Sequence, residues 1–135
     1  MDKNIKRAII SLVCLAVAGG LLFGGKYIFD LLSYRRIVSS IIISTPDISQ
    51  IKDGTFNGIF NAEFISADVD VIVENHRIIE ITLNSHYHER GHAAEAVIDD
   101  VIINQTLGVD TVSGATNSSL VILKAIQIAL ENKVN

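Results

Sequence analysis

Two stretches of unlike hydrophobic pattern divide the chain. The first, from Ala8 to Gly25, contains no charged residue, and its length approaches the roughly 20 apolar residues that a bilayer core requires. The span is apolar on every face, which is unusual for a core helix in so small a protein. We expect a membrane helix within an anchor of residues 1–30. A cleaved signal peptide is the alternative, although its apolar region would usually be shorter.

Basic residues on either side of the apolar span indicate its orientation. Lys6 and Arg7 precede the span immediately, whereas only Lys26 follows it closely. The more basic flank of a membrane helix usually stays in the cytoplasm. The pattern therefore favours a single-pass protein of the cell membrane, with its amino end inside and its carboxy-terminal domain outside the cytoplasm.

A segment of mixed character follows the anchor. Residues 31–52 combine apolar, basic and polar positions and contain the only proline of the chain, Pro46, which interrupts a helix. The turn signal Asp53-Gly54 comes next. We therefore expect a stalk or linker over residues 31–52 and a globular domain over residues 53–135.

Periodicity within the globular domain predicts strands first and helices later. Residues 67–73 and 78–83 are rich in β-branched residues and flank a short polar turn, as in a β-hairpin. Helical spacing of apolar residues predicts a helix over 89–103, stopped by residues 104–108 with Gly108 near the helix end, and an amphipathic helix over 120–130. The expected fold class is α+β: an N-terminal transmembrane helix followed by a small domain with an antiparallel sheet packed against two helices.

Charge and cysteine content exclude several functions. From Tyr27 onward, acidic residues outnumber basic ones about two to one, which argues against a nucleic-acid surface. The single cysteine, Cys14, lies in the apolar span, so the folded part has no disulfide and no thiol nucleophile. No glycine-rich dinucleotide fingerprint follows a strand. A reductase that works alone is therefore disfavoured.

The segment from Asp110 to Ser119 is a hydroxyl- and glycine-rich turn that runs directly into the last predicted helix. Backbone N–H groups in the first turn of a helix attract anions, and small residues allow a phosphate to approach them. The segment is therefore compatible with a phosphate site. An ordinary helix cap with serine or threonine as the capping residue is the alternative.

Several features together resemble the FMN-binding domain family. They are an opening turn and strand at residues 53–58, a central hairpin, Gly91 before Ala94-Glu95, and the motif before the last helix. The resemblance covers about residues 53–130. Known members include membrane-tethered flavin subunits of sodium-pumping NADH:quinone and ferredoxin:NAD oxidoreductase complexes. The most specific element is the pattern Asp-x-x-Ser/Thr-Gly-Ala-Thr, which this chain matches at Asp110, Ser113, Gly114, Ala115 and Thr116.

This resemblance implies a cofactor, a function and partners. Thr116 is expected to carry FMN through a phosphoester bond that a dedicated flavin transferase makes. The domain is then expected to relay electrons between donor and acceptor proteins or within a membrane redox complex. It would be an electron-transfer flavoprotein or oxidoreductase subunit rather than a stand-alone enzyme. The N-terminal helix is expected to contact membrane lipid. No nucleic-acid partner is expected.

Residues near Thr116 have expected roles around the flavin. The small side chains of Gly114 and Ala115 would let the transferase reach the Thr116 hydroxyl. Asp110 would hold the turn through backbone N–H groups. The hydroxyl groups expected to bind the phosphate are those of Ser113, Ser118 and Ser119. The side chains available as a floor for the flavin ring are Leu107, Val109, Val112 and Tyr87.

The histidines before the first predicted helix leave several interpretations open. His86 and His88 share a face if they lie on a strand, and together with His92 they could bind zinc or copper. Alternatively, these histidines are exposed to solvent, or the loop with His88 and Gly91 contacts the flavin, which is the role we expect for these two residues. The alternative function is a non-redox, membrane-anchored binding module, with a histidine-based metal site as one form of it.

Overall fold

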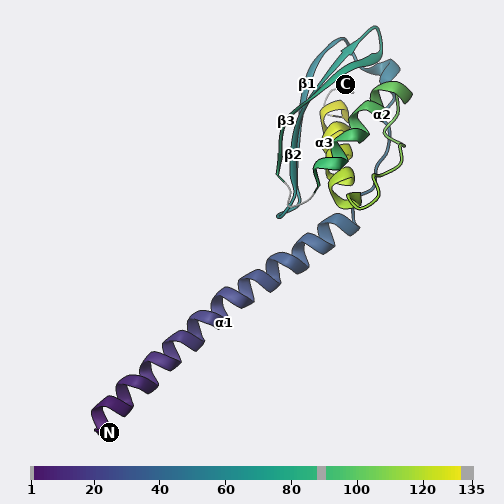
Figure 1. The fold of residues 1–135 in the computed structure, drawn as a ribbon. Helices are drawn as coiled ribbons and strands as arrows, with labels where there is room; N and C mark the ends of the chain where they lie inside the picture. The colour runs from purple at the N-terminus through teal and green to yellow at the C-terminus, as the bar shows by residue number, and fades with distance from the viewer. Residues whose placement is uncertain (1, 88–90, 132–135) are drawn as a thin grey trace. The chain divides into compact units, whose positions relative to one another are not determined.

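The computed structural model describes residues 2–87 and 91–131. The chain forms two compact units, Met1–Arg35 and Arg36–Asn135, which are treated separately below. Figure 1 shows a long helix in the first unit and a small α+β domain in the second. The predicted fold class is confirmed, because a long apolar helix precedes a three-stranded antiparallel sheet and two further helices.

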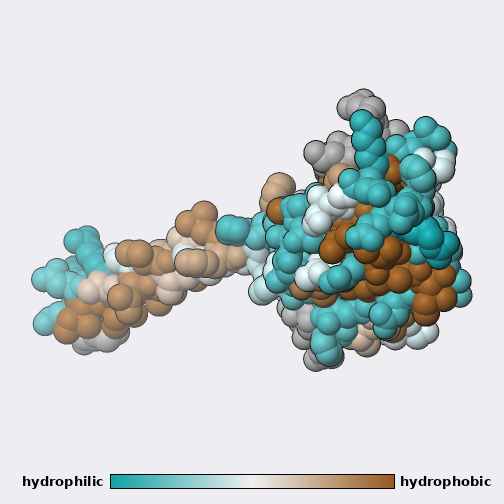
Figure 2. Space-filling model, turned by 90° about the horizontal axis from the view of Figure 1, so that it is seen from above, coloured by the Kyte–Doolittle hydropathy of each residue, from teal (hydrophilic) through white to brown (hydrophobic). Residues whose placement is uncertain are grey.

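The N-terminal helix α1 spans Lys3–Ser39. Its apolar side chains are exposed, as at Leu15 and Phe23, which are 75% and 82% exposed, and Figure 2 shows this hydrophobic surface along the helix. The helix is long and apolar enough to cross a membrane. Beyond the apolar span, Lys26 Nζ lies 2.8 Å from Asp30 Oδ2, an i,i+4 ion pair that supports a helix in water.

The sheet of the second unit has the order β1-β2-β3 and is antiparallel throughout. Its strands are β1 (Gly54–Asn61), β2 (Ser66–Glu74) and β3 (Arg77–Tyr87). Asn75 and His76 connect β2 to β3 with φ angles of 50° and 60°, as a two-residue type I′ turn requires. The predicted hairpin is confirmed.

The last helix, α3 (Thr116–Glu131), is the centre of the domain. In Figure 1 it lies between the sheet and α2 (Val97–Asn104). It packs on β1 and β2. Along β2, buried residues, which include the three valines, alternate with half-buried ones. The side chains of the resulting core that are fully buried include Val69, Val71, Val73, Ile122 and Ile126.

The opposite face of the sheet carries a cluster of polar side chains. The amide of Asn57 donates to Asp68 and Asp70 at 2.7 and 2.9 Å, and the amide of Asn84 donates to the same carboxylates at 3.2 and 2.9 Å. The hydrogen bonds from Asn84 and Asn57 lower the pKa of Asp70 below its ordinary 3.8. This lattice of amides and carboxylates ties the three strands together on the solvent side.

The segment between α1 and β1, which we expected to be a linker, packs within the domain. Thr45 Oγ1 lies 2.9 Å from Thr106 Oγ1 and accepts a hydrogen bond from the backbone N–H of Leu107. The backbone N–H of Ser44 donates to Gln127 Oε1 in α3. After the short 3-10 helix η1 (Ile48–Gln50), Ile51 is fully buried. The segment is thus bonded to α3 through Ser44 and to residues 106–107 through Thr45.

The helix expected over 89–103 is divided in the structure. A 3-10 helix, η2 (His92–Ala96), leads into α2, which ends at Asn104. The helix ends within the predicted stop segment 104–108, and the residue that caps it is Gln105, in the left-handed conformation with a φ of 55°, rather than Gly108. The carboxamide of Gln105 accepts from the N–H of Ile78 and donates to its C=O, both at 2.8 Å, and also donates to the C=O of Ile102. Gln105 thus pairs with the backbone N–H and C=O of Ile78 at the outer edge of β3, as a residue of a neighbouring strand would.

Replacing Gln105 by alanine is expected to destabilise the domain by roughly 2 to 3 kcal/mol, because three hydrogen bonds are lost and the backbone groups of Ile78 are left unpaired. Chemical denaturation of the full chain in detergent measures this change. Gln105→Gly is the control, because glycine relieves the left-handed backbone strain while also removing the carboxamide. Full stability in the glycine variant would show that backbone strain, not the carboxamide, dominates this position.

Candidate functional site

The motif that was singled out in the sequence forms a tight turn at the start of α3. The backbone N–H of Ala115 donates to the C=O of Val112 at 2.9 Å. Gly114, inside this turn, has a φ of +81°, and a Cβ built on it would meet no heavy atom of the described residues within 4 Å. Glycine is favoured here by its backbone conformation. The space beside it stays open.

Ser119 fixes this turn to the helix. Its hydroxyl accepts a hydrogen bond from the backbone N–H of Val112 at 3.1 Å and donates to the C=O of Ala115 at 3.0 Å. Ser119 is fully buried, and Ser118 is only 3% exposed. The structure therefore gives Ser119 a positioning role within the turn, whereas the sequence led us to expect a contact with phosphate.

Thr116 lies on the outside of the same turn. It is the first residue of α3 and is exposed, as are Ser113 and Gly114 before it. The first N–H groups of a helix have no acceptor within the helix, and the helix dipole adds a partial positive charge there. An exposed hydroxyl, an open glycine and a helix start together fit a phosphate group.

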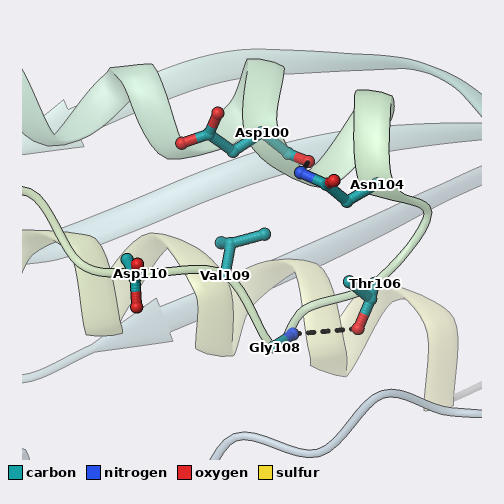
Figure 3. Close-up of a pocket in the computed structure, with 6 residues that line it drawn as sticks. All are labelled: Asp100, Asn104, Thr106, Gly108, Val109 and Asp110. Carbon is teal, nitrogen blue, oxygen red and sulfur yellow. Dashed lines mark hydrogen bonds between the residues drawn. The ribbon is translucent and has the colours of Figure 1, made fainter.

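A cavity of about 480 Å³, open to solvent, lies between α2 and residues 106–110, which precede this turn in the chain. Figure 3 shows Asp100 and Asn104 on α2 and, across from that helix, Val109, whose side chain points toward it, whereas the carboxylate of Asp110 points away from α2. The remaining lining residues are Thr106 and Gly108, which a 3.1 Å hydrogen bond from Gly108 N–H to Thr106 Oγ1 holds together.

Only some of the residues that we expected near the flavin ring line this cavity. Val109 lines it, as does Asp110, which we expected to hold the turn. Val112 is half-buried and does not line it, and Tyr87 is exposed. Leu107 is only 1% exposed and belongs to the core. Sequence reasoning missed Asp100 and Asn104, although polar residues four apart on one helix face are a recognisable signal.

His86 and His92 converge on one carboxylate. His86 Nδ1 lies 3.3 Å and His92 Nδ1 3.0 Å from Glu95 Oε1, and the side chain of His86 is only 2% exposed. Burial raises the pKa of Glu95, but hydrogen bonds from both histidines and attraction to their charges outweigh it, so this pKa lies below its ordinary 4.5. Gly91, expected near the flavin, is buried at the start of η2.

The metal interpretation receives no support from this arrangement. Within residues 2–87 and 91–131, no three histidine, cysteine or acidic side chains are grouped so that they could hold a metal ion. His88, expected as a third histidine or as a flavin contact, lies outside the described residues.

The lowered pKa of Glu95 predicts a pH-dependent contribution to stability. A carboxyl group whose pKa is lower in the folded state stabilises the fold above its unfolded pKa, and this stabilisation is lost as pH falls through the folded value. Glu95→Gln is therefore expected to be less stable than wild type near neutral pH, and the difference should shrink as the pH falls below the ordinary glutamate pKa of 4.5. Urea midpoints of both proteins over this range measure it. A constant difference would contradict this interpretation.

A comparison with known protein families gives a match over most of the second unit. A family model described as the FMN-binding domain matches residues 45–131. The match begins at Thr45, in the segment that packs against α3, and ends at the last residue of that helix. Neither the curated proteins nor the solved structures gave a match.

Proposed function

Because this chain belongs to the FMN-binding domain family and FMN is its cofactor, we propose that Thr116 carries FMN through a phosphoester bond in a membrane-tethered electron carrier. The observation that carries this proposal is the contrast among neighbouring hydroxyl groups. Thr116 is exposed at the helix start, whereas Ser118 and Ser119 are buried. Ser113 is exposed as well, but it precedes the helix; among the hydroxyls of the first turn of α3, that of Thr116 is the one that a transferase can reach.

The attachment needs chemistry that the domain does not supply. A threonine hydroxyl is a weak nucleophile and requires a general base and a metal-bound phosphoryl donor. We assign both to a flavin transferase. The donor is an anhydride of FMN: the Thr116 oxygen forms the new bond to phosphorus, the anhydride bond breaks, and the other half leaves as a phosphate ester. The exposed Ser113 and the open space at Gly114 allow the transferase to approach.

Electron relay is the activity that follows from a bound flavin. FMN accepts and donates one or two electrons, and the protein contributes binding, orientation and local charge. The sequence has no dinucleotide fingerprint, so the electrons come from a donor protein and pass to an acceptor protein or to a membrane redox complex. The domain acts as a redox module among these partners.

The N-terminal helix supplies the proposed tether. Its exposed apolar side chains and its length support insertion into lipid, and the basic residues at its amino end favour that end inside. A reporter enzyme that is active on only one side of the membrane, fused after Asn135, tests the orientation. Activity on the cytoplasmic side would contradict it, and release of the fusion protein from membranes would indicate a cleaved signal peptide instead.

Covalent flavin is tested by producing the full chain together with a flavin transferase. Denaturing electrophoresis under ultraviolet light is expected to show a fluorescent band at the mass of the chain. The positive control is a protein that the same transferase is known to modify. A colourless chain beside a fluorescent control would overturn the proposed attachment.

A further inference from the structure

We propose that the outer edge of β1 pairs with the same edge of a second copy of this chain. The two β1 strands run antiparallel in this pair and join two three-stranded sheets into one sheet of six strands. The inference concerns the sheet rather than the flavin, and it stands independently of the attachment at Thr116.

The two edges of the sheet differ in how they are covered. The order β1-β2-β3 leaves one edge on β1 and the other on β3. On β3, Gln105 bonds both backbone groups of Ile78, and two register shifts interrupt the pairing with β2. On β1, no hydrogen bond among the residues that the structure describes reaches the backbone groups that point away from β2. The edge on β1 is therefore the one that can accept another strand.

β1 also lacks the features that keep natural edge strands from pairing, which are charged side chains, proline and bulges. Its eight residues, Gly54–Asn61, include neither a charged residue nor proline. Its register with β2 is continuous from Gly54 opposite Val73 to Asn61 opposite Ser66. An extended edge of this kind is a template for strand addition.

The side chains of β1 gain apolar contacts from an added strand. Phe56 and Phe60 share a face with Gly58, which lies against α3, and both rings are half-buried. On the other face, Ile59 is 57% exposed. A strand beside β1 would meet these side chains as cross-strand neighbours. Edge pairing thus adds apolar contacts on both faces to the backbone hydrogen bonds.

Charges at the two ends of β1 favour a second copy in antiparallel orientation. Lys52 precedes the strand and Glu63 follows it, and both are exposed. Asp53 is engaged within its own chain, since it accepts a hydrogen bond from the N–H of Asn75 at 2.9 Å. Antiparallel pairing brings Lys52 of each copy toward Glu63 of the other, whereas parallel pairing sets each charge beside its like. The strand is therefore complementary to itself under the twofold symmetry of a dimer.

The rest of the domain leaves room for this pair. Because α3 packs on β1 and β2 and strands lie about 4.8 Å apart, the two α3 helices would be roughly 10 Å apart on one face, as packed helices are. Asp68 and Asp70 lie on β2. The β2 strands of the two copies would be about 14 Å apart, beyond the Debye length of roughly 8 Å at physiological salt. Repulsion between these carboxylates is thus largely screened.

Cysteine cross-linking of the full chain in detergent tests the pairing. The only cysteine, Cys14, is first replaced by serine. Ile59→Cys then places a thiol near the middle of β1, and with a short bis-maleimide it is expected to give a band at twice the chain mass on denaturing electrophoresis. Thr82→Cys, at an exposed position of β3, is the control. It should give no such band, because the two β3 strands of a six-stranded sheet lie about 24 Å apart.

A charge on β1 is expected to remove the cross-link. Thr55→Lys, made in the Ile59→Cys chain, adds to β1 the kind of residue that protects natural edges, and the dimer band should disappear. Thr82→Lys in the same chain is the matched control, since it changes another exposed threonine of the sheet and should leave the band in place. Circular dichroism establishes that both variants are folded.

Three results would overturn the inference. Absence of a dimer band from Ile59→Cys would mean that β1 does not pair with its own copy. Equal bands from Ile59→Cys and Thr82→Cys would indicate random collision or association through α1. A band that persists in the folded Thr55→Lys chain would place the contact away from the edge of β1.

Discussion

Replacing Thr116 by valine is expected to abolish covalent flavinylation while the domain stays folded. Valine has nearly the same shape as threonine but no hydroxyl, so no phosphoester can form. Because Thr116 is exposed, the fold loses no buried contact, and the expected change in stability is within about 0.5 kcal/mol. Denaturing electrophoresis under ultraviolet light, after production with a flavin transferase, measures the loss of fluorescence.

Thr111→Val is the matched control for this experiment. Thr111 precedes the same turn and is half-buried, and its replacement removes one hydroxyl of the same kind from the motif. The fluorescent band should persist in Thr111→Val and disappear in Thr116→Val. A band of equal strength in both variants would place the flavin on another residue.

Replacing Gly58 by alanine is expected to destabilise the domain by about 3 kcal/mol or more, at the upper end of overpacking effects. Gly58 lies in the middle of β1, where the strand crosses α3. A Cβ at this position would clash with the backbone oxygen of Ala125 and would lie 2.6 Å from the backbone N of Ala129. Both are backbone atoms of a helix, so the clash cannot be relieved by a rotamer change.

Denaturant unfolding of the full chain, followed by circular dichroism, measures this effect. Gly108→Ala is a suitable comparison, because its new Cβ would meet Thr106 Oγ1 at 3.4 Å and a Gly→Ala change by itself often stabilises slightly. Similar unfolding midpoints for the two variants would mean that β1 and α3 are further apart than in the structure described above.

Local patterns were sufficient to predict the hairpin and the last helix. The β-branched alternation around residues 67–83 and the polar turn between the strands are local signals. The apolar spacing after residue 116 is another. The close contact at Gly58 has no such signal in the local sequence, because it depends on which strand packs against which helix.

The parts that sequence reasoning missed depend on contacts between distant residues. Gln105 ends α2 because its carboxamide bonds the edge of β3, a partner 27 positions away. Thr45 belongs to the domain because it meets Thr106 and Leu107. Asp100 lines the cavity because α2 lies beside residues 106–110 in the fold, an arrangement that the local sequence does not indicate.

The hydroxyl-rich motif shows both the value and the limit of a local pattern. Its residues indicated a phosphate site at a helix start, and the structure places an exposed Thr116 there. The same pattern could not distinguish serines that face solvent from those that hold the turn. Ser119 is of the second kind because the backbone N–H of Val112 needs an acceptor.

The most direct test of the central claim is mass spectrometry of the peptide that contains Thr116, from full chain produced with an active flavin transferase. We expect a peptide heavier than the unmodified one by FMN less one water, with fragments that place the addition on Thr116. An unmodified Thr116 peptide from a chain that still retains FMN after purification would contradict it, since flavin would then be bound without the phosphoester.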